Sequence, residues 1–286
     1  MRRPNWSIGA ASLTADRSIG RNDPRLNVRS SPTVTNMSGL SFADVLDDSI
    51  LVYLENQAAF QDWITEQTGG GSDELSVDLV KQQITYIPKL HKREEVVARV
   101  HLLGSVATEP RSALWAWANP AYADRPIAEM CKRVRDFGET REIPELTTGE
   151  LPIPPEEGDS DLLSTFATKM AAVSCRITGI PTSQIINRGT SRAVMLVDTA
   201  GFTTPPASGI RFPRLFSTAI SVPHYVSDQR RAAQGYAQAH TLPYGWEPNF
   251  SALNIGFPEG NVRLAFSEQG LLSDIKAGFS APPPES

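Results

Sequence analysis

The sequence predicts an α+β protein, in which helices pack on an antiparallel sheet. Apolar residues recur at helical spacing over residues 42–67 and 160–178, whereas apolar and polar residues alternate over 94–103. The predicted order is one helix followed by three strands. This order differs from the regular strand–helix alternation of a parallel, nucleotide-binding sheet, and it favours an antiparallel meander with a helix across it.

The first predicted helix has clear end signals. Ser41 followed by Asp44 resembles a capping box, and the triple glycine at 69–71 ends the pattern. Three strands are expected next, over 75–87, 94–103 and 112–118, and Gly104 is expected to end the second of them. We predict that the second and third strands pair antiparallel through a hairpin around Glu109-Pro110.

The rest of the chain is predicted to mix helices with hairpin strands. The expected elements are a helix from Pro126 to Gly138, a connector over 142–158, a helix ending at Gly179, strands at 184–188, 192–199 and 217–222, a polar helix over 228–240, and a hairpin over 262–276.

The charge is distributed unevenly along the 286 residues. The net charge is −5, but residues 1–36 contain six arginines and two aspartates, a balance of +4, so the remainder carries −9. We expect a disordered basic tail over 1–40, one domain over 41–278 with possible sub-lobes 41–200 and 216–278, and a disordered tail over 279–286. One hypothesis is that translation starts at Met37, which would leave residues 1–36 outside the native protein.

Composition excludes several classes of function. An acidic body repels nucleic-acid phosphates, and no apolar run is long enough to cross a membrane. Cys131 and Cys175 sit among apolar residues and are expected to be reduced core thiols, which favours a cytoplasmic protein. The four histidines lack metal-ligand spacing, and no phosphate-binding loop or dinucleotide fingerprint occurs, so no metal and no cofactor is predicted.

The most distinctive run is Leu114-Trp115-Ala116-Trp117-Ala118-Asn119-Pro120. On a strand, Trp115, Trp117 and Asn119 would point to one side. We favour a structural interpretation, in which the two indoles form a buried aromatic layer. The functional interpretation is an aromatic floor for a ligand or peptide, with Asn119 as its polar anchor.

At this run the sequence resembles a family of bacterial proteins of unknown function, common in actinobacteria, in which a strand carries Trp-x-Trp-x-Asn. The matching residues are Trp115, Trp117 and Asn119, preceded by Leu103-Gly104-Ser105 where the family tends to have a glycine-containing turn. The resemblance extends over about residues 42–200, with a possible extension through the hairpin at 262–276. It implies no known activity and transfers no catalytic residue.

Two functions remain open. The first, which we favour, is a non-enzymatic binding or interaction protein that uses an apolar groove and takes a protein or peptide partner. The second is an acid–base or hydrolase-like enzyme for an anionic small molecule, with His101, Arg99, Glu109 and Arg111 as its candidate residues. We expect His101 to be solvated at a sheet edge. The sequence leaves the oligomeric state open.

Overall fold

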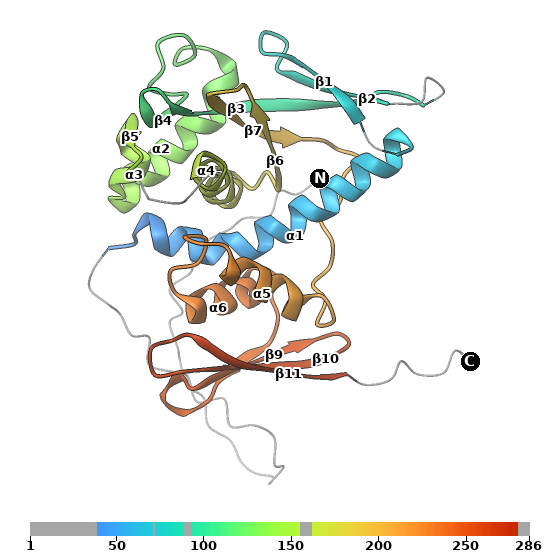
Figure 1. Cartoon of the computed structure of the whole chain (residues 1–286), viewed down its shortest axis with the longest axis vertical. Coiled ribbons are helices and arrows are strands. Elements are labelled where there is room, and N and C mark those ends of the chain that lie inside the picture. The colour runs from blue at the N-terminus through green and yellow to red at the C-terminus, as the bar shows by residue number, and fades with distance from the viewer. Residues whose placement is uncertain (1–38, 71, 89–92, 155–161, 280–286) are drawn as a thin grey trace, which may run out of the picture. The chain divides into compact units, whose positions relative to one another are not determined.

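Two antiparallel sheets and a set of helices make up the part of the chain that the computed structural model describes, residues 39–70, 72–88, 93–154 and 162–279 (Figure 1). The predicted α+β class is confirmed. The two tails that we expected to be disordered lie outside these ranges, apart from residues 39, 40 and 279.

Helix α1, Phe42–Thr68, begins and ends where the sequence indicates. Ser41 accepts a hydrogen bond from the Asp44 amide at 3.1 Å, and the Asp44 carboxylate accepts one from the Ser41 amide at 2.9 Å. This is the predicted capping box. At the other end Gly69 adopts a left-handed conformation, with φ of 70°, and its amide donates to the Glu66 carbonyl at 3.2 Å. Both predicted end signals are therefore confirmed.

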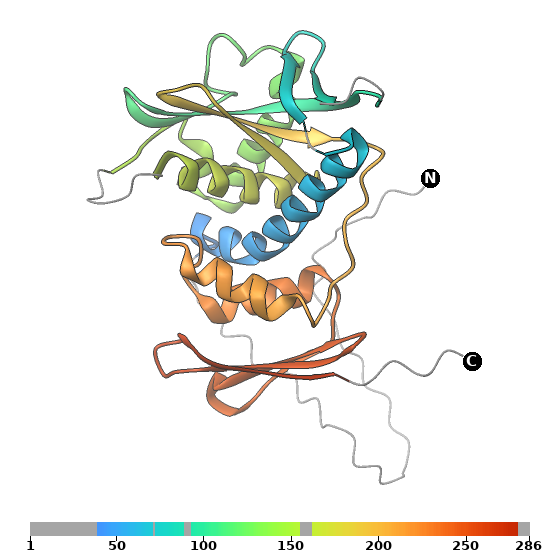
Figure 2. The same cartoon turned by 45° about the vertical axis from the view of Figure 1, so that its right-hand side comes forward.

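Helix α1 is buried on several sides because other helices pack around it. It contacts α4 (Leu162–Thr178), α5 (Phe212–Ser221) and α6 (Gln229–Ala239), and Figure 2 shows it between α4 and the α5–α6 pair. Its buried set accordingly includes polar as well as apolar side chains. These are Val45, Leu46, Asp47, Ser49, Ile50, Leu51, Tyr53, Glu55, Asn56, Phe60, Ile64 and Thr68.

Polar contacts fasten α6 to the start of α1. The Asp47 carboxylate accepts hydrogen bonds from the amides of Ser227 and Asp228, both at 2.9 Å, just before α6 begins. In the first turn of α6, Arg231 donates to both carboxylate oxygens of Asp48 at 2.9 and 2.7 Å and to Asp44 at 2.8 Å. Such a fork-shaped pairing fixes orientation as well as distance.

The larger sheet has seven strands within the described residues. Strands β1 to β5 pair in sequence order, with β2 along the first part of β3 and β4 along its last part. Strand β7 pairs with β3 over residues 99–107, and β6 pairs with β7; all pairs are antiparallel. The strands are β1 (Ser72–Asp78), β2 (Gln83–Pro88), β3 (Val96–Thr108), β4 (Arg111–Trp115), β5 (Glu150–Pro152), β6 (Thr182–Asn187) and β7 (Ser191–Asp198). The predicted hairpin of β3 and β4 around Glu109-Pro110 is confirmed, and the strands predicted at 184–188 and 192–199 pair with each other as β6 and β7.

Two strand predictions need new boundaries. The segment 75–87 is not one strand but two, because a turn at 79–82 separates β1 from β2. The predicted strand 112–118 ends at Trp115, and residues 116–118 form a turn closed by a hydrogen bond from the Ala118 amide to the Trp115 carbonyl. Trp117 and Asn119 therefore do not continue the strand.

Gly104 does not end β3, which runs on to Thr108. The glycine instead lies at a bulge, where the pairing with β7 shifts between Leu102 and Gly104. A Cβ atom at this position would overlap the carbonyl oxygen of Leu114 on the adjacent strand. Glycine is thus required here by the close approach of two strands.

The glycine at position 138 is also explained by close packing. A 3-10 turn, Pro126–Ala128, leads into α2, Glu129–Arg141, so the helix continues past the glycine that we expected to end it. A Cβ at Gly138 would lie 2.5 Å from that of Leu146, which follows on α3, Pro144–Thr147. The glycine permits close packing of the two helices, and Glu142 in a left-handed conformation ends α2.

The C-terminal part has a four-stranded sheet of its own. Within the described residues, β8 (Tyr244–Trp246), β9 (Ala252–Phe257), β10 (Gly260–Phe266) and β11 (Leu272–Phe279) pair antiparallel in this order. A 3-10 turn over Pro248–Phe250 links β8 to β9. The β10–β11 hairpin was predicted, whereas β8 and β9 were not. Phe212, Tyr236 and Phe257 form an aromatic cluster between this sheet and the helices, with ring centroids 4.7 and 5.4 Å from Phe212.

The predicted strand 217–222 is wrong, because this segment belongs to helix α5. Phe212, Phe216 and Ala219 are buried at helical spacing, and Pro213 occupies the first turn, where proline is tolerated. Elsewhere the predicted burial of Cys131 and Cys175 as free thiols is confirmed. No helix in the described ranges is both long and apolar enough to span a membrane.

Candidate binding cleft

A cleft of about 190 Å³ opens on one face of the seven-stranded sheet. Its apolar lining comes from Leu102 on β3, from Ala193 and Met195 on β7, and from Leu79 in the β1–β2 turn. The opposite face of the sheet packs on α4, since a Cβ at Gly104 would lie 3.2 Å from the Met170 methyl group of that helix. The cleft therefore occupies the face that α4 leaves uncovered, and we call it the sheet cleft.

The bulge in β3 decides which side chains line the sheet cleft. Leu102 pairs with Met195, and Ser105 pairs with Ala193, so each pair lies on a single face. Without a bulge, residues three apart on a strand would point to opposite faces. The additional residue at the bulge brings Leu102 and Ser105 to the same face, and both line the cleft.

The turn after β4 supplies Asn119 and Tyr122 to the lining. The Asn119 side-chain oxygen accepts a hydrogen bond from the Ala121 amide at 3.0 Å, and its carbonyl accepts one from the Tyr122 amide at 2.9 Å. This local pattern, typical of asparagine in turns, fixes the direction of the loop. It occupies the Oδ1 atom of Asn119 and leaves its amide NH₂ group for other partners.

The β6–β7 turn supplies Arg188 and Ser191. Arg188 follows the last residue of β6, and its amide donates to the Ser191 carbonyl at 2.9 Å, which closes the turn. The neighbouring Arg192 donates to the Asn187 side chain at 2.8 Å and braces the same turn. Arg188 makes no ion pair within the described residues, so its guanidinium is the free positive charge at the cleft.

Of the three binding candidates, only Asn119 lines the sheet cleft. Trp115 is fully buried and donates from its indole nitrogen to the Glu145 carbonyl on α3 at 3.0 Å. Trp117 is partly buried, and its ring lies 5.5 Å from the Arg135 guanidinium of α2. The two indoles pack toward the α2–α3 segment, so neither forms a floor for a ligand in this cleft.

The rival enzyme candidates are spread along β3 and do not meet. Arg99 lies near the start of the strand, His101 at its centre opposite Leu196, and Glu109 and Arg111 at the hairpin beyond its end. His101 is 2 % exposed, which corrects our expectation of a solvated edge residue. Burial lowers the pKa of His101, and the nearby Arg99 lowers it further.

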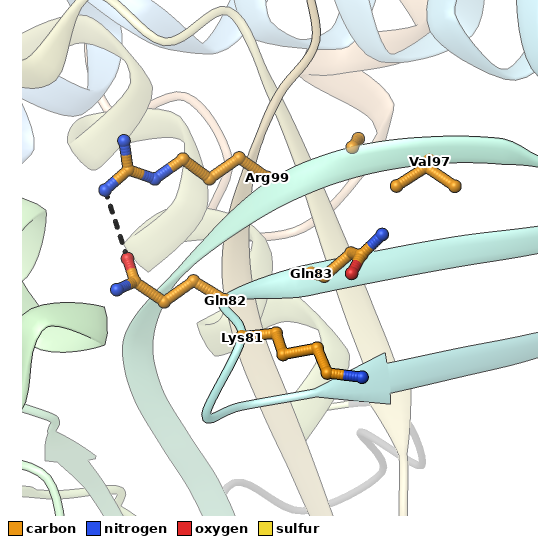
Figure 3. A pocket seen from close by; sticks show the side chains of 6 residues that line it. Lys81, Gln82, Gln83, Val97 and Arg99 are labelled. Carbon is orange, nitrogen blue, oxygen red and sulfur yellow. Dashed lines mark hydrogen bonds between the residues drawn. The ribbon is translucent and has the colours of Figure 1, made fainter.

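Arg99 instead borders a second, broader hollow, which Figure 3 shows with Lys81, Gln82, Gln83 and Val97. It measures about 370 Å³, and Arg99 donates to the Gln82 side chain at 3.2 Å across it. The hollow is open, and Val97 remains 48 % exposed. A ligand there would stay in contact with water, so the smaller but more enclosed sheet cleft is the better candidate.

A buried polar cluster around Glu55 was not foreseen. The Glu55 carboxylate accepts hydrogen bonds from the Tyr236 hydroxyl at 3.1 Å, while His240 Nε2 lies 3.0 Å away without hydrogen-bond alignment. Burial and the adjacent carboxylate raise the pKa of Tyr236. Glu55 lies on α1, Tyr236 on α6 and His240 directly after α6, so the cluster joins segments about 180 positions apart in the chain. It borders neither the sheet cleft nor the open hollow.

The described residues contain neither a metal-binding cluster of side chains nor an activated thiol at Cys131. No group of three or more histidine, cysteine, aspartate or glutamate side chains there is placed to hold a metal ion. Burial raises the pKa of the Cys131 thiol to about 12, so it stays protonated and unreactive at neutral pH.

Comparison with known protein families assigns this chain to a family. A model of a family of unknown function (DUF6882) matches residues 43–200. No curated protein and no solved structure matches the chain. The matched region runs from α1 to β7 and contains every residue that lines the sheet cleft, whereas α5, α6 and β8–β11 follow it. Because the match covers more than half of the 286 residues, the chain belongs to the family of unknown function DUF6882.

Proposed function

We propose that this chain is a binding protein whose ligand enters the sheet cleft. The observation that carries the proposal is the composition of the lining: an apolar floor of Leu102, Ala193 and Met195 meets polar side chains from two separate turns. Small-molecule sites commonly combine an apolar lining with a few convergent polar groups. At about 190 Å³ the cleft is smaller than most drug-sized pockets, so it suits a small molecule or a single side chain of a partner.

The lining favours binding over catalysis. It contains no histidine, cysteine, aspartate, glutamate or lysine, which are the usual general acids, bases and nucleophiles. Ser105, Ser191 and Tyr122 supply hydroxyl groups, but no base in the lining is present to activate them. The alternative enzyme built on His101 lacks an assembled set of residues, because Arg99 lies near the start of β3 whereas Arg111, on β4, pairs with the last residue of β3.

We further infer that the Trp-x-Trp-x-Asn run serves the family in two ways. Trp115 anchors the end of β4 to α3, and this anchoring positions the following turn. Asn119 in that turn then contacts the ligand. The buried free thiols support the proposal of a cytoplasmic location.

A cleft-filling variant tests the binding function. Ala193→Trp places a large ring on the floor, whereas Ala277→Trp places the same ring on exposed β11 of the other sheet. A fragment library would be screened by ligand-observed NMR against the parent and both variants. We expect a set of fragments that bind the parent and Ala277→Trp but not Ala193→Trp.

Two results would contradict the proposal. The first is that no fragment distinguishes Ala193→Trp from the parent while circular dichroism shows that both are folded. The second is that a bound fragment is chemically converted during the NMR experiment, which would restore the enzyme alternative.

A further inference from the structure

The polar side chains of the sheet cleft share one property: each can donate a hydrogen bond. They are Ser105, Asn119, Tyr122, Arg188 and Ser191. No carboxylate lines the cleft, although the chain carries 32 acidic residues against 27 basic ones. A lining that offers donors and one positive charge is complementary to an anion.

Most of these donors remain available within the described residues. The hydroxyls of Ser105, Tyr122 and Ser191 make no hydrogen bond there, and Asn119 uses only its side-chain oxygen, toward the Ala121 amide. Arg188 in the β6–β7 turn and Arg192 at the start of β7 differ in the same respect. Arg192 donates to the Asn187 side chain and to two turn carbonyls, whereas Arg188 lines the cleft and makes no such contact.

The charge and size of the cleft restrict the class of anion that it can bind. One guanidinium with neutral donors matches a single negative charge, and a guanidinium fork fits the two oxygens of a carboxylate. A phosphate monoester carries a charge nearer −2 and would leave part of it unpaired. The floor of Leu102 and Met195 is apolar, and the volume of about 190 Å³ admits only a short tail.

Building on the binding function proposed above, we propose that the ligand of the sheet cleft is a small carboxylic acid with a short apolar tail. Arg188 and Asn119 contact its carboxylate, and Leu102 and Met195 contact its tail. The same chemistry occurs in a free metabolite-sized acid and in the C-terminal residue of a peptide.

Matched probes test this inference by calorimetric or NMR titration. Hexanoate and hexanamide share the tail and differ in the charge of the head group, and hexyl phosphate replaces the carboxylate by phosphate. A charge-assisted hydrogen bond contributes roughly 1.5–3 kcal/mol, so hexanoate should bind the parent at least about tenfold more tightly than hexanamide. Arg188→Gln should remove this preference. Arg214→Gln, at an exposed position of α5, should retain it.

A further probe distinguishes a free acid from a peptide C-terminus as the source of the carboxylate. This probe is the tripeptide N-acetyl-Gly-Gly-Leu, used as its free acid and as its amide. Binding of hexanoate supports a free acid as ligand, and binding of the tripeptide acid without hexanoate supports a peptide C-terminus. Tighter binding of hexyl phosphate than of hexanoate would overturn the inference, as would the failure of both acids to bind.

Failure of the carboxylate inference differs from failure of the binding function. If hexanamide binds as tightly as hexanoate, and Ala193→Trp abolishes the binding of both probes, the cleft binds ligands without selecting for a negative charge. If the fragment screen finds nothing that Ala193→Trp excludes, the binding function itself is wrong.

Discussion

Leu102 and Ser105 point to the same face of the seven-stranded sheet, although they lie three residues apart on one strand. Their partners on β7, Met195 and Ala193, are two residues apart, so the bulge at Gly104 accounts for the difference. Both residues line the sheet cleft, and its shape therefore depends on a backbone irregularity at a glycine.

Substitution of this glycine should damage both stability and the cleft. A Cβ in Gly104→Ala would overlap the Leu114 carbonyl oxygen, a backbone atom that cannot move without displacing β4. Overpacking of this kind costs roughly 1–3 kcal/mol. Urea denaturation would measure the loss, with Gly245→Ala as the control because a Cβ there meets nothing within 4 Å. Equal stability of the two variants would contradict the role assigned to Gly104.

The two tryptophans of the 114–120 run should differ in their contribution to stability. Trp115 is fully buried, so Trp115→Ala should cost roughly 3–5 kcal/mol through lost burial and a cavity. Trp117 is partly exposed and its indole nitrogen has no hydrogen-bond partner within the described residues, so Trp117→Ala should cost about 1–2 kcal/mol. Denaturation of each variant measures the difference. A larger loss for Trp117→Ala would contradict the assignment of Trp115 to the core.

Local sequence signals predicted the regular elements well. Ser41 and Asp44 fixed the start of α1, and Gly69 and Gly179 fixed the ends of α1 and α4, because capping depends on nearby residues. The alternation of Val262, Leu264 and Phe266 likewise identified β10, whose three apolar side chains are all buried.

Long-range contacts explain the errors. In the sequence, Gly104 and Gly138 resemble residues that end a strand or a helix. In the structure they allow close approach to Leu114 and Leu146, and the residues next to each glycine do not indicate these contacts. Strand 217–222 was wrong because the helical spacing begins five residues earlier, at Phe212.

The site itself was only partly predictable. Asn119 was identified from its place in the tryptophan run, and it does line the cleft. Arg188 and Ser105 have no local signal, because they reach the cleft only through the β6–β7 turn and the β3 bulge. His101 was expected in water because its neighbour Arg99 is charged, but the residue is buried, and helices α2 and α4 both contact β3.

Burial of His101 should make the stability depend on pH. Burial lowers its pKa in the folded state below the ordinary value near 6.5, with Arg99 and Arg133 acting in the same direction and Asp198 against it. As the pH falls below about 6.5, the unfolded chain binds a proton more readily than the folded one. Neutral His101 therefore makes its full contribution to the free energy of unfolding above this pH. That contribution is lost as the pH falls through the folded-state pKa.

Urea denaturation between pH 8 and pH 5 would measure this loss for the parent and for His101→Leu. Other titrating groups cancel in the difference, so the parent should lose stability relative to His101→Leu as the pH falls. His224→Asn, at an exposed position, controls for the removal of a histidine. A constant difference between the parent and His101→Leu over this range would show that His101 takes up its proton equally well in the folded chain.

Close packing of α6 against α1 gives the last prediction. A Cβ in Gly235→Ala would lie 2.7 Å from the Asp48 Cα, so the two helices would have to separate. Alanine favours a helix over glycine by about 1 kcal/mol. Overpacking against backbone costs roughly 1–3 kcal/mol, and separation would also lengthen the Arg231–Asp48 hydrogen bonds, now 2.9 and 2.7 Å. We therefore expect a net loss of about 1–2 kcal/mol by urea denaturation. A gain in stability would mean that helix propensity outweighs packing and that the contact between α1 and α6 can relax.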